Sequence, residues 1–226
     1  MILYVGTDTA KRYREGTGLH TMRGAIEDLA GDACLLLHYT QITPAIVAGL
    51  RPWAICHSGG GTDYAEYDVL SHPDYQAVIH ESPVAQIGFC GGHQILAHSF
   101  GSRLGPIRRL RPGEPDPSPY SPGSFKEWGV YPVRIVSKDP LFNGCGRTIR
   151  VQEYHYWEVK RLAASLIRLA ESADCRVQAF RHRSRPIYGT QFHPEQSPPA
   201  YPDGKTILTN FFEIAREHAK GTAGRG

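Results

Sequence analysis

The chain has 226 residues, of which 41% are hydrophobic and 21% charged, and its formal net charge is +3. This composition is typical of a globular protein with a sizeable core, and so small a charge argues against nucleic-acid binding. The five cysteines are odd in number and show no CxxC spacing, which argues against both a zinc cluster and a secreted disulfide framework. No apolar run approaches the ~20 residues of a membrane span.

The first residues, Met1 to Gly6, are apolar and lack the basic segment with which a signal peptide begins. We therefore expect the chain to start with a strand and the protein to be cytoplasmic. Basic residues cluster at 108–111 and 181–185, where solvated loops are the expected explanation. Neither nucleic acid nor a membrane is an expected partner.

Strand-like and helix-like segments alternate from the N-terminus to about residue 100, as a doubly wound sheet requires. In chain order, the expected strands are 2–5, 34–39, 53–57 and 84–89, and the expected helices are 18–29, 43–50, 74–80 and 93–100. Thr43 and Pro44 are typical of an N-cap followed by the first helical position. The pattern predicts an α/β fold: a doubly wound, mostly parallel sheet with helices on both faces.

The alternation stops after Gly101. Residues 105–123 contain six prolines and little apolar content, which predicts a long loop insertion. A linker between two domains is the alternative, but too little chain separates this loop from the next strands to support two cores. Further on we expect a small β-ribbon at 128–136 and 148–151, strands at 166–172, 177–182 and 187–192, and a last helix at 207–220. We thus expect residues 1–226 to form a single domain with a disordered tail at 221–226.

The most informative segment is 88–94, which reads Gly-Phe-Cys-Gly-Gly-His-Gln. Cys90 stands between an expected strand and an expected helix, with glycines before and after it, as in a nucleophile elbow. Only residues with little or no side chain fit beside the reactive residue in so sharp a turn. The helix that starts at Gly91 also points free N–H groups at the sulfur, which favours the nucleophilic thiolate.

A second segment, 188–195, reads Tyr-Gly-Thr-Gln-Phe-His-Pro-Glu and follows another expected strand. It offers His193 as a base and Glu195, two residues further on, to orient that base. A lone cysteine or histidine at a strand end is usually an inert, packed side chain. The glycines around Cys90, together with the partners that a Cys-His-acid triad needs, instead predict a catalytic cysteine.

The two segments resemble the triad-type class I glutamine amidotransferases, and in particular the glutaminase domain of GMP synthase. Three further segments support the resemblance, because 57–61 is similar to the family's oxyanion loop, 177–189 to its last sheet strands and 204–211 to its closing helix. Residues 139–144 also have a counterpart there, so the similarity covers nearly the whole chain. It implies the flavodoxin-like fold of that family.

The resemblance implies that Cys90 attacks the side-chain amide of glutamine and forms a γ-glutamyl thioester, which water then hydrolyses. His193 would transfer protons while Glu195 holds its ring, and the N–H groups of Gly60 and Gly91 would bind the oxyanion. The implied substrate-binding residues are Gly59, Gln94, Tyr154 and His155. For Gln94, a helix-face residue bonded to local backbone is the alternative. No metal and no cofactor are implied.

One segment departs from the family pattern. Where the GMP synthase type has serine, glycine and aspartate, this chain has Tyr154, Tyr156 and Trp157. The stretch helps to hold the α-amino and α-carboxylate groups of glutamine in the family, so a reshaped and more apolar pocket is expected. Either Glu153 or Glu158 would supply the lost negative charge. Ordinary packing of the ribbon on the sheet is the alternative explanation of the aromatic residues.

Three functions stay open on the sequence. The first is a glutaminase that supplies ammonia to a separate synthetase polypeptide, because no P-loop or other nucleotide motif occurs in this chain. The second is a hydrolase of another γ-glutamyl amide or peptide, which the altered pocket favours. The third is a catalytically weak binding or regulatory module of the same fold, against which the complete triad argues.

Overall fold

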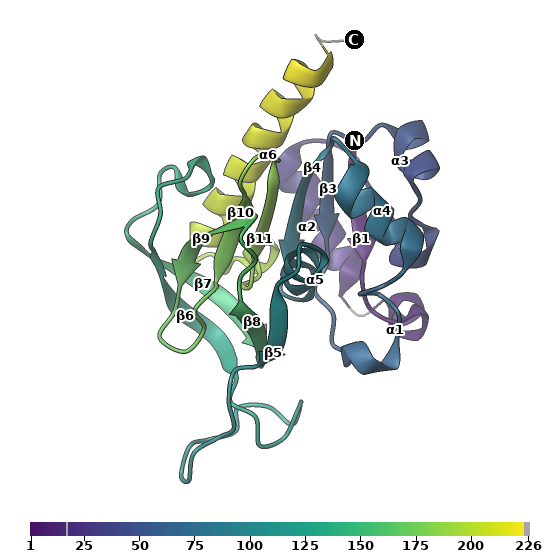
Figure 1. The fold of residues 1–226 in the computed structure, drawn as a ribbon. Coiled ribbons are helices and arrows are strands. Elements are labelled where there is room, and N and C mark those ends of the chain that lie inside the picture. The colour runs from purple at the N-terminus through teal and green to yellow at the C-terminus, as the bar shows by residue number, and fades with distance from the viewer. Residues whose placement is uncertain (17, 224–226) are drawn as a thin grey trace.

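Nine strands form the main sheet: β1 (Ile2–Gly6), β2 (Cys34–His38), β3 (Ala54–His57), β4 (Ala85–Phe89), β6 (Glu127–Ile135), β7 (Thr148–His155), β9 (Leu166–Glu171), β10 (Ala179–His182) and β11 (Ile187–Thr190). The structure is a computed structural model, and it describes residues 1–16 and 18–223. The strand order is β2-β1-β3-β4-β11-β10-β9-β6-β7 (Figure 1). Strands β2, β1, β3, β4 and β11 are parallel, whereas β11, β10, β9, β6 and β7 pair antiparallel.

Six α-helices are described: α1 (Ala10–Glu15), α2 (Leu19–Ala30), α3 (Pro44–Leu50), α4 (Pro73–Glu81), α5 (Gly91–Ser99) and α6 (Asp203–Ala223). Successive strand residues point to opposite faces of the sheet, so β1 contributes Ile2 and Tyr4 to one buried cluster and Leu3 and Val5 to another. The first cluster also takes in α2 and α6, and the second takes in α3, α4 and α5. The doubly wound α/β prediction is confirmed.

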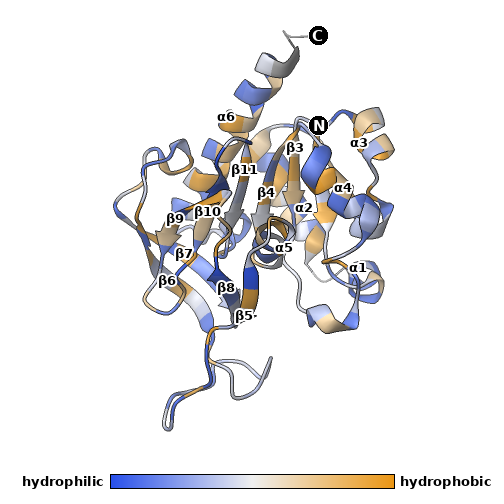
Figure 2. Cartoon of the chain, viewed as in Figure 1, coloured by the Kyte–Doolittle hydropathy of each residue, from blue (hydrophilic) through white to orange (hydrophobic). Residues whose placement is uncertain are grey.

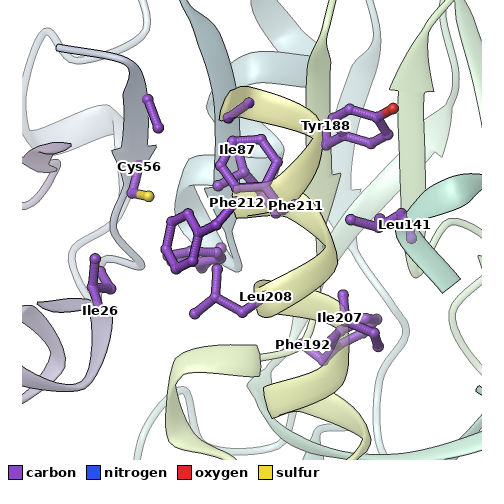
Figure 3. Close-up of a cluster of buried hydrophobic side chains, with 14 of the residues drawn as sticks. Ile26, Cys56, Ile87, Leu141, Tyr188, Phe192, Ile207, Leu208, Phe211 and Phe212 are labelled. Carbon is purple, nitrogen blue, oxygen red and sulfur yellow. The ribbon is translucent and has the colours of Figure 1, made fainter. Parts of the chain in front are cut away.

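Helix α6 closes one face of the sheet. Figure 3 shows its residues Leu208, Phe211 and Phe212 in one cluster with Ile87 of β4 and Tyr188 of β11. In Figure 2 the hydrophobic colour is strong on β3, which lies between β1 and β4, whereas the far end of α6 is mostly polar. Because both clusters share one sheet, we propose that the chain forms a single domain. Among the described residues, no helix is both long and apolar enough to cross a membrane.

The proline-rich segment differs in part from its prediction as a plain loop. Gly105 and Pro106 end a strand, β5 (Arg103–Pro106), which pairs with β8 (Trp157–Arg161) in a separate two-stranded sheet. The rest forms an arm below β5 (Figure 1). Lys126, almost fully buried, pairs with Asp116, and Arg108 pairs with Glu114. The first pair joins the arm to the residue before β6, and the second joins two residues within the arm.

Three other expectations need correction or detail. The predicted ribbon exists as β6 and β7, but it extends the main sheet. Helix α1 was not predicted, since its six residues are too few for a clear helical period. The predicted tail is wrong for 221–223, which continue α6, because each residue added to an existing helix gains a hydrogen bond without a new nucleus. Residues 224–226 lie outside the described residues.

Candidate active site

Cys90 sits in a strained turn between β4 and α5. Its φ is +47° and its ψ is −104°, a conformation that costs a non-glycine residue about 1–3 kcal/mol. The flanking glycines are needed because a Cβ on Gly88 would come within 2.4 Å of Gly92, and one on Gly92 within 2.3 Å of the His57 carbonyl oxygen. The predicted elbow is therefore present, and Cys90 is 6% exposed.

The sheet brings the second motif to this cysteine. Strand β11 pairs with β4 in parallel, with Thr190 opposite Phe89, and the Cys90 backbone N–H donates to the Thr190 carbonyl at 2.8 Å. Carboxyl ends of parallel strands share one edge, so the chain that leaves β11 passes Cys90 directly. Its next residues place His193 against Gly59, whose Cβ would lie 3.0 Å from His193 Cε1 and 3.5 Å from Cys90 Cβ.

His193 and Glu195 form a buried pair. His193 Nδ1 lies 2.7 Å from Glu195 Oε1, and the two residues are 8% and 6% exposed. A carboxylate only accepts, so Nδ1 carries the proton and Nε2 faces the sulfur side. Burial alone would lower the pKa of His193, but the negative charges of Glu195 and Cys90, with hydrogen bonds to both, raise that pKa well above its ordinary value.

The loop after β3 and the start of α5 each place one backbone N–H group near the sulfur, those of Gly60 and Gly91. A Cβ on Gly91 would lie 2.8 Å from the Gly60 nitrogen, so these glycines are adjacent, and both line a cavity together with Cys90. Gly91 is the first residue of α5, and the helix offers its N–H no acceptor. Asp8 holds the loop by accepting from the Gly61 N–H at 2.8 Å, in ion-pair contact with Arg12.

Gln94 is tied to several groups around the cavity. Its Nε2 donates to the Trp157 carbonyl at 2.9 Å and to Gln191 Oε1 at 3.0 Å, while its Oε1 accepts from the Tyr64 hydroxyl at 2.9 Å. Gln191 also donates through Nε2 to Cys90 Sγ at 3.6 Å. Gln94 thus lines the cavity, as expected, but its partners come from distant segments and not from the local backbone.

His155 does not present a polar atom to a substrate. Its Nδ1 lies 2.8 Å from the Trp157 carbonyl oxygen, and its Nε2 lies 2.8 Å from Glu127 Oε2 and 3.2 Å from Glu153 Oε2. All these partners accept, so both ring nitrogens are protonated. Burial would lower the pKa of His155, but the carboxylates of Glu153 and Glu127 raise it well above its usual value. The expected substrate contact of His155 is therefore indirect.

Neither glutamate proposed as a counter-charge serves the pocket. Glu153 is fully buried and contacts His155 without hydrogen-bond geometry, and burial raises its pKa to about 7 despite the attraction of His155. Glu158 bonds to Lys160 at 2.5 Å and to the Arg176 N–H at 3.3 Å. Cys175, Glu127 and His155 have ligand atoms within 4.8 Å of one another, but the imidazolium of His155 offers no lone pair to a metal.

The cavity beside Gln94 is narrow because aromatic rings fill it. Its volume is ≈ 30 Å³, room for about one or two waters. The aromatic rings that line it belong to Tyr64, Tyr120, Tyr154, Tyr156 and Trp157. The Tyr120 hydroxyl donates to the Gly61 carbonyl at 2.7 Å, which fixes the arm against the oxyanion loop. Asp63 also lines this cavity, and its carboxylate accepts from the Ala65 N–H at 2.9 Å.

Most of the expected residues meet at Cys90, with two qualifications. Tyr154 stacks at an angle on His193, with ring centroids 5.8 Å apart, and so separates the cavity from the imidazole. Gly59 lies on the His193 side of the sulfur and not among the residues around Gln94. Four further residues at the site were not predicted. Asp63, Tyr64 and Tyr120 lie outside any recognisable motif, and Gln191 lies within the second motif but had no role assigned to it.

A strained cysteine elbow beside a buried His-Glu pair, at the carboxyl edge of a doubly wound sheet, defines a class of cysteine-dependent α/β hydrolases and transferases. Comparison with known proteins makes the class specific. The family model for glutamine amidotransferase class-I matches residues 35–215. The chain belongs to the class-I glutamine amidotransferase family.

Individual relatives agree with this family. One subunit of the glutamine-hydrolyzing GMP synthase from Pyrococcus furiosus is 33% identical over 206 residues, 89% of this chain and 95% of that one. Its counterpart from Archaeoglobus fulgidus is 37% identical over 137 residues, 61% of this chain and 65% of that one. A solved chain from Thermoplasma acidophilum superposes with a TM-score of 0.72 at 25% identity, covering 99% and 98% of the two chains. A glutamine amidotransferase from Thermotoga maritima shares the fold, with a TM-score of 0.63 at 17% identity over 96% and 98% of the chains.

Proposed function

We propose that this chain hydrolyses the side-chain amide of glutamine with Cys90 as the nucleophile, His193 as acid and base, and Glu195 as the group that orients the imidazole. The observation that carries the proposal is the strained Cys90 elbow beside the buried His193–Glu195 pair, 2.7 Å between Nδ1 and Oε1. Strain of this kind persists only where the surrounding structure enforces it, and it clusters at active sites.

The mechanism follows from the positions of these groups. His193 Nε2 takes the thiol proton of Cys90, and the sulfur attacks the amide carbonyl carbon. The N–H groups of Gly60 and Gly91 bind the oxyanion that forms. One such donor is typically worth about 3 kcal/mol of barrier. The tetrahedral intermediate collapses to a γ-glutamyl thioester as the His193 imidazolium protonates the departing ammonia. His193 then takes a proton from water, which attacks the thioester and releases glutamate and the thiol.

The ammonia is proposed to pass to a separate synthetase polypeptide. The support is that the relatives are named as one subunit of GMP synthase, and that the similarity covers nearly the whole length of the Pyrococcus chain. Such a partner would receive ammonia near the Cys90 edge of the sheet, where it is formed. A cytoplasmic location is proposed on the same ground.

The test is glutamate release from glutamine by the purified chain, followed with and without Cys90→Ala. We expect turnover in the wild type and none in the variant. Cys145→Ala is the matched control, because Cys145 is the half-buried cysteine and lies away from the site. Glutamate release that survives Cys90→Ala would overturn the proposal.

A further inference from the structure

Two cavities meet at Cys90, and they differ greatly in size. The cavity beside Gln94 has a volume of ≈ 30 Å³, as described above. A second cleft, on the other side of Cys90, has a volume of ≈ 380 Å³ and is lined by His193 and Glu195 as well as the sulfur. Gln94 does not belong to its walls, and Tyr154 lies between the two spaces.

The chemistry of acyl transfer assigns each cavity to one half of the substrate. The leaving nitrogen must lie within hydrogen-bond reach of the imidazole that protonates it, so the amine leaves on the His193 side. The acyl half, which stays on the sulfur, must occupy the side away from His193. The larger cleft is therefore the amine side, and the narrow cavity beside Gln94 is the γ-glutamyl side. Because that cavity of ≈ 30 Å³ has room for only one or two waters, its aromatic walls must move apart to admit the γ-glutamyl group.

A hydrolase that releases only ammonia needs little room on the amine side. A cavity needs only about 10–15 Å³ to hold one water-sized molecule, so the cleft of ≈ 380 Å³ has roughly 25 times the room that ammonia requires. Part of its wall is apolar, because Leu19 and Met22 of α2 line it. An amine that carries a short hydrocarbon chain would bury that chain against these side chains, with about 0.8 kcal/mol gained per buried methylene.

The charges of the cleft are already compensated within the protein. Asp8, which is 5% exposed, lies 2.9 Å from the Arg12 guanidinium, and Glu195 lies 2.7 Å from His193. A neutral alkyl chain in the cleft would therefore lie beside charges that already have partners, so it would not need to supply a counter-ion to them. This balance favours a neutral alkyl chain over a tail with a charge of its own.

We propose that the amine side of this site accepts primary alkylamines, so that the enzyme also hydrolyses γ-glutamyl alkylamides. The inference rests on the proposed function, since it uses the same thioester at Cys90. The Cys90 sulfur forms a bond to the γ-carbonyl carbon, the C–N bond breaks, and the alkylamine leaves with the proton of His193. Water then cleaves the thioester to glutamate, so the sum is amide plus water giving glutamate plus alkylamine.

The test compares γ-glutamylethylamide with glutamine as substrates of the purified full chain, with glutamate release as the readout. We expect kcat/KM for the ethylamide within tenfold of that for glutamine. A value below one-thousandth of the glutamine value would overturn the inference and leave the proposed function standing, with the cleft then serving only as an exit for ammonia. Hydrolysis of the ethylamide without hydrolysis of glutamine would overturn the proposed function alone, and turnover of neither would overturn both.

A variant at the cleft wall separates this role from general effects on activity. Met22→Trp is expected to fill the cleft and to lower the ethylamide-to-glutamine ratio of kcat/KM at least tenfold. Met22→Leu, which preserves volume and hydrophobicity, is the matched control and should keep the wild-type ratio. Thermal unfolding of both variants checks the fold. An unchanged ratio in folded Met22→Trp would place the alkyl chain elsewhere and overturn the assignment of the cleft.

Discussion

Glu195→Gln isolates what the charge of Glu195 does for the imidazole. In the wild type the carboxylate accepts from His193 Nδ1 at 2.7 Å, so Nε2 is free to exchange a proton with Cys90. The amide of a glutamine at 195 can still accept, but it carries no charge. Gln196 Nε2 lies 3.2 Å from the same Nδ1, and it becomes a competing donor once the carboxylate is gone. That competition favours the tautomer protonated on Nε2, which cannot take a proton from the thiol.

The expected loss follows from the burial of the pair, whose side chains are 10% and 2% exposed for His193 and Glu195. A buried hydrogen bond to a charged group is worth about 1.5–3 kcal/mol, which corresponds to a ~10- to 150-fold loss in kcat/KM. Gln196→Ala in the Glu195→Gln background removes the competing donor and should recover several-fold of this loss. His193→Ala should lose more than Glu195→Gln, because it removes the base itself.

The pH profile gives an independent readout. The charge of Glu195 is the largest influence that raises the pKa of His193 against the opposing effect of burial, so Glu195→Gln lowers that pKa. The imidazolium that protonates the leaving amine is then lost at lower pH, and the alkaline limb of kcat shifts to lower pH. Glutamate release measured from pH 6 to 10 tests this, with circular dichroism as the control for folding. Wild-type kcat/KM together with an unmoved alkaline limb would refute the role assigned to Glu195.

Four further outcomes are expected. Cys90→Ala should abolish labelling by an electrophilic glutamine analogue, and labelling at Cys145 with Cys90 untouched would contradict the assignment of the nucleophile. Asp63→Asn should raise KM for glutamine about two- to fivefold with kcat unchanged. The reason is that an exposed ion pair between Asp63 and the substrate ammonium is worth up to about 1 kcal/mol. An unchanged KM would exclude that ion pair. Trp157→Asp should raise kcat/KM about 5- to 150-fold by adding a partly buried counter-charge, whereas uncharged Trp157→Asn should not, and equal effects would show that size alone matters. The pKa of Glu153 is about 7 in place of 4.5, so its ionisation destabilises the folded state by an amount that is absent below pH 4.5 and reaches about 3 kcal/mol above pH 7. Glu153→Gln should therefore raise the unfolding temperature at pH 8 and leave it nearly unchanged at pH 4.5. An equal shift at both pH values would refute this cost of burying the charge.

Local patterns predicted the strands and helices of the main sheet because each buries a face with its own period. Strands β5 and β8 escaped prediction, since they are short and pair with each other across more than 50 residues, outside the main sheet. Helix α1 is only six residues long and depends on its caps, with Thr9 accepting at its start and Gly16 in a left-handed conformation at its end. None of these three elements has enough of a repeating apolar pattern to be recognised from the sequence.

The candidate triad was predictable because its members sit in two short motifs at strand ends. The pocket walls were predictable only in part, because they are assembled from distant parts of the chain: Tyr154 and Trp157 were expected there, whereas Asp63 and Tyr120 were not. Asp63 follows β3, Tyr120 comes from the proline-rich arm, and Trp157 begins β8. Gln94 shows the limit most clearly, since three hydrogen bonds join it to Tyr64, Trp157 and Gln191 and none of these is near it in sequence.

The residues that carry out the reaction follow strands of the sheet, whereas residues that shape the substrate pocket lie in loops. Cys90 and His193 follow β4 and β11, so the pairing of these central strands fixes their separation. Tyr120 and Asp63 belong to segments outside the sheet, and the hydroxyl bond from Tyr120 to Gly61 links the arm to the oxyanion loop. Changes in the arm can therefore widen the γ-glutamyl cavity without moving the nucleophile.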